Sequence, residues 1–210
     1  MVGIFGGSFD PIHNGHLEVA FQVRDRLNLK IFFALTKQNP LKERALLSYE
    51  ERFHLLNLAI KEHYNFYALK EEYIYAIDLV KKIKKDFNLN KIYFITGLDS
   101  FLSLKKWKNY KELLKETNFI ICSRGKKENK EVFLNFLKDL NINSYKILDD
   151  FYTKYNPQNE KIIYLKIPYL EISSTLIKNY IKHSFDLYPY LPEKVYKYLK
   201  IKIERGKLHV

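Results

Sequence analysis

The sequence has one cysteine, one methionine and one tryptophan among its 210 residues. A single cysteine excludes an internal disulfide, which is typical of a protein of the reducing cytoplasm. No apolar run reaches the roughly 18 residues that a membrane-spanning helix needs. The first residues, MVGIFGGSFDP, lack the basic and apolar stretches of a secretory signal. We therefore expect a cytoplasmic protein with neither a membrane anchor nor an export signal.

Glycine and proline are also scarce, with seven and six residues, and no repeat or low-complexity tract interrupts the chain. Hydrophobic residues make up 47% and charged residues 29%, which excludes disorder and collagen-like structure. The length favours one domain. We expect residues 1–200 to form it and residues 201–210 to be a C-terminal tail.

Acidic residues are outnumbered, since 36 Lys and Arg against 24 Asp and Glu give a net charge of +12. Three interpretations stay open. The charge could serve a nucleic-acid partner, attract small anionic substrates such as nucleotides, or belong to a solvated surface of Lys-rich amphipathic segments. Charge alone does not decide the function.

Short apolar runs rich in β-branched and aromatic residues predict buried strands at 2–5, 30–35, 65–69, 91–96, 118–122 and 161–166. Helical spacing predicts helices at 16–28, 77–87, 108–116 and 131–140, and a last one after Pro192. Ser48 and Glu51 form a capping box that opens a further helix through about His63. Residues 143–161 are predicted to be a loop.

Strands that alternate with helices in this way predict an α/β fold, an open parallel sheet with helices on both faces. In such a sheet, ligands bind outside the carboxyl ends of the strands, near the point where the strand order reverses. The segments that follow the strands are therefore the place to look for a site.

Residues 6–16, after the first strand, read GGSFDPIHNGH. Two glycines permit a tight turn and a close approach of the backbone to a ligand. His16 would lie in the first turn of a helix, where free N–H groups and the helix dipole favour a phosphate. Two imidazoles three residues apart, with Gly15 leaving space beside them, suit charge stabilisation on a phosphoryl group. The alternatives are an ordinary strand-to-helix turn and a metal site, although no cysteine or third histidine is close in sequence.

A second segment, ISSTLIK at 172–178, places three hydroxyls where a helix would start. Such hydroxyls cap the unpaired N–H groups of the helix, and the same N-terminus can hold a triphosphate. A plain helix cap is the alternative.

Together, the two segments resemble the signatures of the HxGH nucleotidyltransferase superfamily. Its members have a Rossmann-like fold, attack the α-phosphate of a nucleoside triphosphate and release pyrophosphate. The order and spacing of the remaining segments resemble the family of bacterial nicotinate-nucleotide adenylyltransferases. The resemblance runs from residue 3 to about residue 200.

The resemblance implies the site residues. His13, His16 and Lys178 would be catalytic, acting on the phosphates in the transition state. The nucleotide would be bound by Gly6, Gly7, Ser8, Phe9, Gly97, Asp99, Arg124, Ser173, Ser174 and Thr175. The mononucleotide would be bound by Lys42, Tyr75, Ala76 and Trp107. No residue is expected to hold a metal in a protein cage, because Mg²⁺ would enter with ATP and keep several waters.

Two of these positions depart from the family pattern. Lys178 stands where the family usually has Arg, which keeps the charge but loses the bidentate fork. Ala76 stands where the family tends to have Thr, so that a hydroxyl is lost near the acceptor. Trp107, Arg124 and Lys42 also have plain interpretations, as an anchoring ring, a surface cation and a solvated charge.

The expected function is adenylyl transfer from ATP to nicotinate mononucleotide, giving deamido-NAD and pyrophosphate, without a nucleic-acid or membrane partner. One alternative is the same chemistry on nicotinamide mononucleotide, phosphopantetheine or another phosphomonoester. A basic nucleic-acid-binding module and an inactive ligand sensor are further alternatives. The sequence leaves open whether the protein is a monomer or a homo-oligomer.

Overall fold

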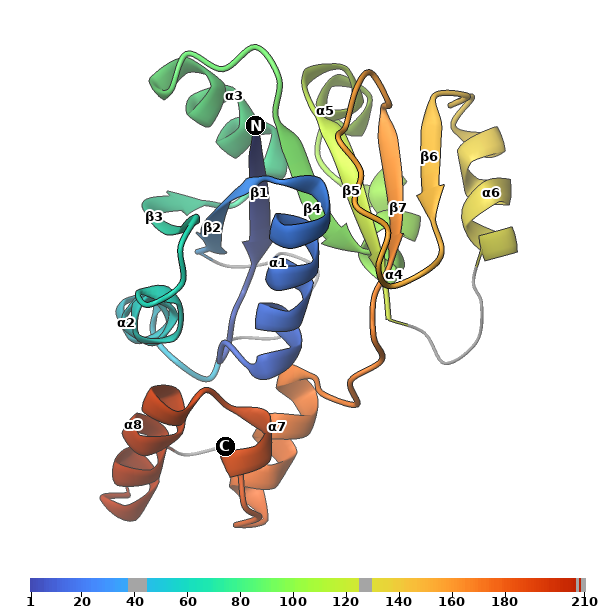
Figure 1. Cartoon of the computed structure of the whole chain (residues 1–210). Coiled ribbons are helices and arrows are strands. Elements are labelled where there is room, and N and C mark those ends of the chain that lie inside the picture. The colour runs from blue at the N-terminus through green and yellow to red at the C-terminus, as the bar shows by residue number, and fades with distance from the viewer. Residues whose placement is uncertain (38–44, 125–129, 207, 209–210) are drawn as a thin grey trace.

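The computed structural model describes residues 1–37, 45–124, 130–206 and 208, in which strands and helices alternate (Figure 1). The strands are β1 (Val2–Gly7), β2 (Lys30–Thr36), β3 (Phe66–Tyr73), β4 (Tyr93–Gly97), β5 (Asn118–Ser123), β6 (Tyr145–Leu148) and β7 (Ile162–Lys166). The helices are α1 (Asn14–Leu27), α2 (Tyr49–Ile60), α3 (Ala76–Asp86), α4 (Leu98–Leu102), α5 (Tyr110–Glu116), α6 (Lys130–Asp139), α7 (Ser174–Lys182) and α8 (Glu193–Glu204). Short 3₁₀ turns lie at Leu104–Lys106 and Tyr188–Tyr190.

In the described part of the chain, seven strands form one parallel sheet in the order β3-β2-β1-β4-β5-β7-β6. From β1 the chain first builds β2 and β3 on one side and then crosses to β4 on the other, so the strand order reverses between β1 and β4. Helices α7 and α8 lie beyond the carboxyl ends of the strands (Figure 1). The predicted α/β fold with an open parallel sheet is thus confirmed, and the reversal point lies at Gly7 and Gly97.

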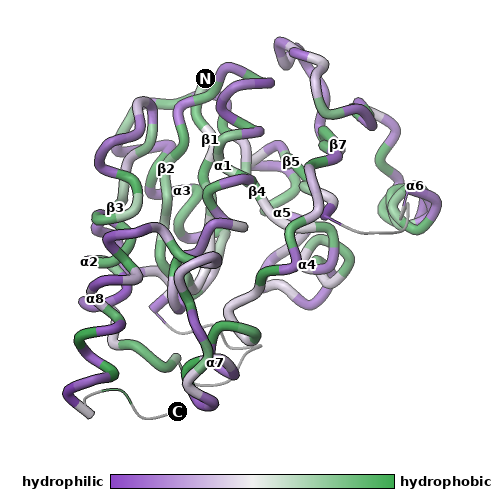
Figure 2. Tube along the Cα trace, turned by 60° about the horizontal axis from the view of Figure 1, so that its bottom comes forward, coloured by the Kyte–Doolittle hydropathy of each residue, from purple (hydrophilic) through white to green (hydrophobic). Residues whose placement is uncertain are grey.

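Both faces of the sheet are buried, because successive strand residues point to opposite sides. Phe5 belongs to the apolar cluster under α1, α2, α7 and α8, whereas its neighbour Ile4 belongs to the cluster under α3, α4, α5 and α6. Figure 2 shows the central strands as mostly hydrophobic segments flanked by helices of alternating hydropathy. This pattern explains why the strands read as continuous apolar runs.

The predicted strands and helices are found within a few residues of their expected ends. The capping box is present: the Ser48 hydroxyl accepts a hydrogen bond from the Glu51 amide at 3.2 Å, and the Ser48 amide donates to the Glu51 carboxylate at 3.0 Å. The helix ends at Ile60, three residues before the predicted end.

The predicted loop at 143–161 is wrong in part, because it contains β6. This edge strand is only four residues long, with Tyr145 and Lys146 exposed and Leu148 buried, so it lacks the apolar run of a buried strand. Two helices also differ from expectation, since α4 was not predicted and α8 continues to Glu204, past the predicted start of the tail. None of the described helices is long and apolar enough to cross a membrane.

Candidate active site

Gly6 and Gly7 are the last residues of β1, and aromatic side chains pack closely against both. A Cβ on Gly6 would lie 2.6 Å from the Tyr73 hydroxyl and 2.8 Å from the Phe94 ring, and one on Gly7 would lie 3.0 Å from the Phe9 ring. The glycines were expected to allow a tight turn and the approach of a ligand. Their immediate neighbours in the structure are side chains of the protein.

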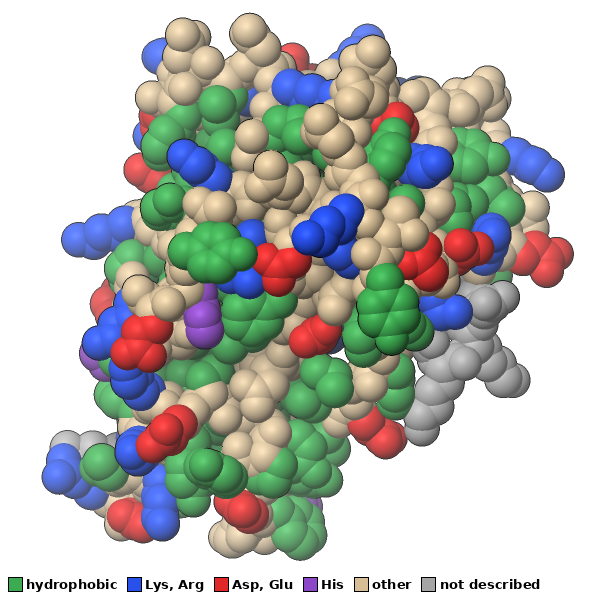
Figure 3. All heavy atoms as spheres, viewed as in Figure 1, with side chains coloured by type: hydrophobic (Ala, Val, Ile, Leu, Met, Phe, Trp, Pro, Cys, Tyr) green, Lys and Arg blue, Asp and Glu red, His purple; other side chains and the backbone are tan. Residues whose placement is uncertain are grey.

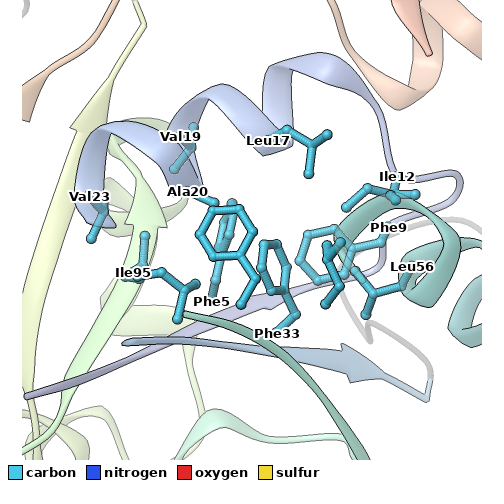
Figure 4. Packing of buried hydrophobic residues seen from close by; sticks show 14 of the residues in the cluster. Phe5, Phe9, Ile12, Leu17, Val19, Ala20, Val23, Phe33, Leu56 and Ile95 are labelled. Carbon is cyan, nitrogen blue, oxygen red and sulfur yellow. The ribbon is translucent and has the colours of Figure 1, made fainter. Parts of the chain in front are cut away.

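Phe9 anchors the turn that follows β1. Its backbone has a φ of 43°, in the left-handed region, and its ring is 1% exposed. The ring packs edge-to-face on Phe5 and on His16, with centroids 5.4 and 5.0 Å apart. Figure 4 shows Phe9 and Ile12 pointing into the core between α1 and the sheet. A binding role for Phe9 is therefore left to its main chain, while its ring fixes the position of His16.

His13 and His16 are stacked at the N-terminus of α1. Their ring centroids are 3.6 Å apart with an interplanar angle of 22°. His13 precedes the helix at its cap position, and His16 lies in the first turn. A Cβ on Gly15 would lie 3.1 Å from His13 Nδ1, so the glycine leaves room for the ring, as predicted. Both imidazoles thus lie where the N–H groups of a helix start favour an anion.

Burial and the nearby positive charge of Arg124 lower the pKa of His13 to about 3. His13 is 1% exposed, and its Nδ1 makes no hydrogen bond within the described residues. Because the ring is neutral at pH 7, one nitrogen donates a hydrogen bond and the other accepts one. A buried, neutral imidazole of this kind is suited to donate to a phosphate oxygen.

Arg124 follows β5 and reaches the same place. Its guanidinium lies 3.5 Å from the position that a Cβ on Gly15 would occupy, and its charge acts on His13. The structure therefore brings Arg124 together with the histidine pair, although more than 100 residues separate them in the sequence.

Helix α7 carries the second motif. The Ser173 hydroxyl caps the helix by accepting a hydrogen bond from the Leu176 amide at 3.1 Å. Ser173 and Thr175 are exposed and Ser174 is half-buried. One turn further, the Lys178 ammonium lies 2.6 Å from a carboxylate oxygen of Asp10. This contact joins the second motif to the turn after β1.

Of the residues expected to bind the mononucleotide, the described ones, Tyr75, Ala76 and Trp107, lie against the apolar cluster on the other face of the sheet. The half-buried Trp107 ring packs edge-to-face on Phe94 with centroids 5.8 Å apart, and its Nε1 donates to the Ser103 hydroxyl at 3.3 Å. Phe94 is also the ring that approaches Gly6. Trp107 is thus anchored close to the end of β1.

Tyr75 and Ala76 form the start of α3, and both are half-buried. The Lys108 ammonium lies 4.2 Å from the centre of the Tyr75 ring. Because Ala76 is the first residue of the helix, this end offers main-chain N–H groups to an anion.

Gly97 ends β4 and Asp99 lies exposed in the first turn of α4. A Cβ on Gly97 would meet no described atom within 4 Å. The space beside this glycine is therefore open to a ligand. Lys42 lies outside the described residues.

Two residues of the scaffold were missed by the sequence analysis. Arg52 of α2 is 2% exposed and donates to the Ser8 carbonyl at 2.7 Å and the Thr36 carbonyl at 2.9 Å, which ties the ends of β1 and β2 together. Asp10, predicted only to shape a turn, accepts hydrogen bonds from the Leu46 and Leu47 amides at 2.7 and 2.9 Å. Arg52 could have been suspected from the sequence, because it is a charged residue within the amphipathic pattern of α2. No sequence pattern indicates the contacts of Asp10.

Solved structures share this fold at low sequence identity. A Plasmodium falciparum nicotinic acid mononucleotide adenylyltransferase complexed with NaAD has a TM-score of 0.69 and 20% identity, with 96% of this chain and 95% of that chain covered. The same protein complexed with APC has a TM-score of 0.69 and 19% identity, with 99% and 98% covered.

Curated relatives are more similar in sequence. A probable nicotinate-nucleotide adenylyltransferase of Carboxydothermus hydrogenoformans is 34% identical over 205 residues, which cover 94% of each chain. Another from Clostridium novyi is 33% identical, with 91% of this chain and 92% of that chain covered. Residues 4–180 match the family described as cytidylyltransferase-like, and this match spans β1 to α7 and includes both motifs. The chain belongs to the cytidylyltransferase-like family.

Proposed function

We infer that this chain transfers the adenylyl group of ATP to nicotinate mononucleotide, giving deamido-NAD and pyrophosphate in NAD biosynthesis. The observation that carries this inference is the stacked pair His13 and His16 at the start of α1, with Arg124 beside it. Relatives up to 34% identical over nearly the whole chain, which are named probable nicotinate-nucleotide adenylyltransferases, support the choice of acceptor.

The reaction makes modest demands on the protein. The phosphate of the mononucleotide is already ionised at pH 7, so no general base is needed. One of its oxygens attacks the α-phosphorus of ATP in line, and the bond to the oxygen bridging the α- and β-phosphorus breaks as pyrophosphate leaves. Catalysis is then a matter of positioning the reactants and stabilising charge on the phosphoryl oxygens.

The residues at the start of α1 fit this task. His13 and His16 donate hydrogen bonds to oxygens of the α- and β-phosphates, and Arg124 supplies a fixed positive charge beside them. The hydroxyls of residues 173–175 and the N-terminus of α7 hold the rest of the triphosphate, and Lys178 lies one turn further along the same helix. Ser8 and the main chain of residues 6–9 line the same edge.

The acceptor occupies the other side. Trp107 stacks on the pyridine ring, while the main-chain N–H groups at Tyr75 and Ala76 meet the nicotinate carboxylate. On the ATP side, Gly97 lets the backbone approach the nucleotide, and Asp99 accepts hydrogen bonds from its ribose. Lys42, outside the described residues, is a further candidate to contact the mononucleotide.

Mg²⁺ would enter with the triphosphate as part of the substrate Mg-ATP rather than in a protein cage. The imidazoles and cations around His13 are suited to phosphate oxygens, since the charge of Arg124 repels a second cation placed directly on the protein. When bound, Mg²⁺ would supply charge neutralisation to the pyrophosphate leaving group.

The basic charge of the chain serves nucleotide attraction and solvation, without a nucleic-acid or membrane partner, and the single cysteine fits an enzyme of the cytoplasm. Figure 3 supports this view, because Lys and Arg side chains are interspersed with Asp and Glu over the face that it shows. Several lysines of the chain form ion pairs, for example Lys105 with Asp139 at 2.5 Å.

The test is pyrophosphate release from Mg-ATP with nicotinate mononucleotide, nicotinamide mononucleotide and phosphopantetheine offered in parallel. Release with the nicotinate form alone is expected. Equal release with both mononucleotides would withdraw the selectivity but keep the chemistry. Release with phosphopantetheine alone, or with none of the three, would contradict the proposed function.

A further inference from the structure

The carboxylate of Asp10 joins three segments that are distant in the sequence. It is the acceptor for the Lys178 ammonium at 2.6 Å, the Leu46 amide at 2.7 Å and the Leu47 amide at 2.9 Å. Its side chain is 4% exposed and that of Lys178 is 28% exposed. Asp10 itself lies in the turn that carries His13. One carboxylate therefore connects this turn to α7 and to the segment that enters α2.

A buried carboxylate needs both hydrogen-bond donors and a compensating charge. Here the two amides donate, and Lys178 supplies the nearest cation. Arg52 also acts on Asp10 electrostatically, from the α2 side. Arg52 is held in place by hydrogen bonds to the main-chain carbonyls of Ser8 and Thr36, independently of Asp10. Lys178, in contrast, connects its helix α7 to this turn through its ion pair with Asp10.

Lys178 lies one helical turn from the start of α7, where Ser173 and Thr175 are exposed. A constraint at Lys178 therefore fixes the place of that helix start relative to the turn after β1. The same contact occupies the ammonium, since Asp10 already neutralises its charge at 2.6 Å. Lys178 is thus better placed to hold α7 than to act as an independent ligand of the triphosphate.

We propose that Asp10 is a positioning residue, which through its ion pair with Lys178 holds the N-terminus of α7 against the turn that carries His13 and His16. Through its hydrogen bonds to Leu46 and Leu47, it also fixes the segment that enters α2. The link to catalysis rests on the proposed function, in which α7 binds the triphosphate of ATP. The Asp10–Lys178 ion pair and its effect on the position of α7 do not depend on the proposed function.

Steady-state kinetics of single variants separate this role from direct binding by Lys178. Lys178→Met raises the KM for ATP about tenfold and leaves the KM for the mononucleotide unchanged, because only α7 is released. Asp10→Asn raises both KM values, because it loosens α7 and the segment before α2 together. An Asp10→Asn enzyme with an unchanged or lower KM for ATP would overturn the proposal, since a freed ammonium would then bind the triphosphate better.

The double variant Asp10→Asn/Lys178→Met gives a second criterion. If the two residues act as one unit, its KM for ATP is no higher than that of Asp10→Asn alone. A KM equal to the product of the two single effects would overturn the proposal. Lys182→Met, an exposed lysine one turn further along α7, is the matched control and leaves both KM values unchanged.

Hydrogen exchange of the ligand-free protein tests the ion pair without any substrate. The amides of Leu176 and Ile177, which bond to Ser173, exchange faster in Lys178→Met than in the wild type, and slow exchange returns in Lys178→Arg. Unchanged exchange in Lys178→Met would overturn the proposal. This readout stands even if Asp10→Asn does not fold or if the wild type is inactive with nicotinate mononucleotide, so the two failures are distinguishable.

Discussion

The two sides of the candidate site differ in how firmly the protein holds them. On the side of the reacting phosphates, His13 and Phe9 are each 1% exposed and Asp10 is 3% exposed. On the proposed acceptor side, Tyr75, Ala76 and Trp107 are half-buried, and Lys108 beside Tyr75 is exposed. In the proposed function, the side that holds the reacting phosphates is thus continuous with the core, whereas the side that recognises the acceptor is built on half-buried and exposed residues. Substitutions on the first side are therefore expected to affect catalysis and stability, and those on the second to affect selectivity.

The largest effect is expected from His16→Ala. The variant should lose at least about 100-fold in kcat, because a preorganised donor to the transition-state charge disappears. The fold should persist, since His16 is only partly buried. Circular dichroism and steady-state kinetics check both points, with the exposed His183→Ala as the control. Near wild-type kcat in His16→Ala would place the chemistry elsewhere.

Gly6 and Gly97 offer a matched comparison between the two strand ends. Gly6→Ala should destabilise the protein by about 1–3 kcal/mol, because its Cβ would collide with Tyr73 and Phe94. Gly97→Ala meets no described atom and should leave the unfolding free energy unchanged. If a ligand lies against Gly97, the Gly97→Ala substitution should still raise the KM of a substrate by on the order of 10-fold.

Urea unfolding and kinetics of the two variants distinguish these effects. An equal loss of stability in both variants would contradict the expected difference between the two strand ends, since it would mean that the end of β4 is packed as tightly as the end of β1. An unchanged KM in Gly97→Ala would remove Gly97 from the binding site.

The pH dependence of stability should report the burial of His13. Its folded pKa of about 3 lies below the usual value of 6.5, so the unfolded chain binds the proton first as the pH falls. The contribution of His13 to stability is therefore complete above pH 6.5 and is lost between pH 6.5 and 3, at up to about 1.4 kcal/mol per pH unit. His13→Gln should show a shallower decline over this range. Parallel curves for the two proteins would show that His13 titrates normally.

The smallest effect is expected on the acceptor side. Ala76→Thr restores a hydroxyl at the start of α3, and one added hydrogen bond is worth about 1 kcal/mol. The ratio of kcat/KM for nicotinate over nicotinamide mononucleotide should rise about fivefold with no change in thermal stability. A fall in this ratio would mean that the carboxylate does not approach this end of α3.

The sequence predicted the fold well because its strongest signals are local. Buried strands appear as apolar runs, and the Ser48 and Glu51 pair fixes a helix start within four residues. The edge strand β6 was missed because exposed Tyr145 and Lys146 give it no such run.

At the candidate site, the motifs single out the turn after β1, but they do not reveal which contacts hold it in place. Gly6 is explained by Tyr73 and Phe94, and Asp10 by Leu46 and Lys178, which are contacts across tens of residues or more. Such partners are set by the topology of the sheet, which places the ends of β1, β2 and β4 together. No local pattern encodes them.

The most direct test of the account is to follow the α-phosphorus of ATP. With Mg-ATP labelled at that position and nicotinate mononucleotide as acceptor, the wild type should transfer the label to deamido-NAD and leave the released pyrophosphate unlabelled, and His16→Ala should do so at least about 100-fold more slowly. Label found in ADP or free AMP, or transfer at an unchanged rate in His16→Ala, would contradict adenylyl transfer at the turn between β1 and α1.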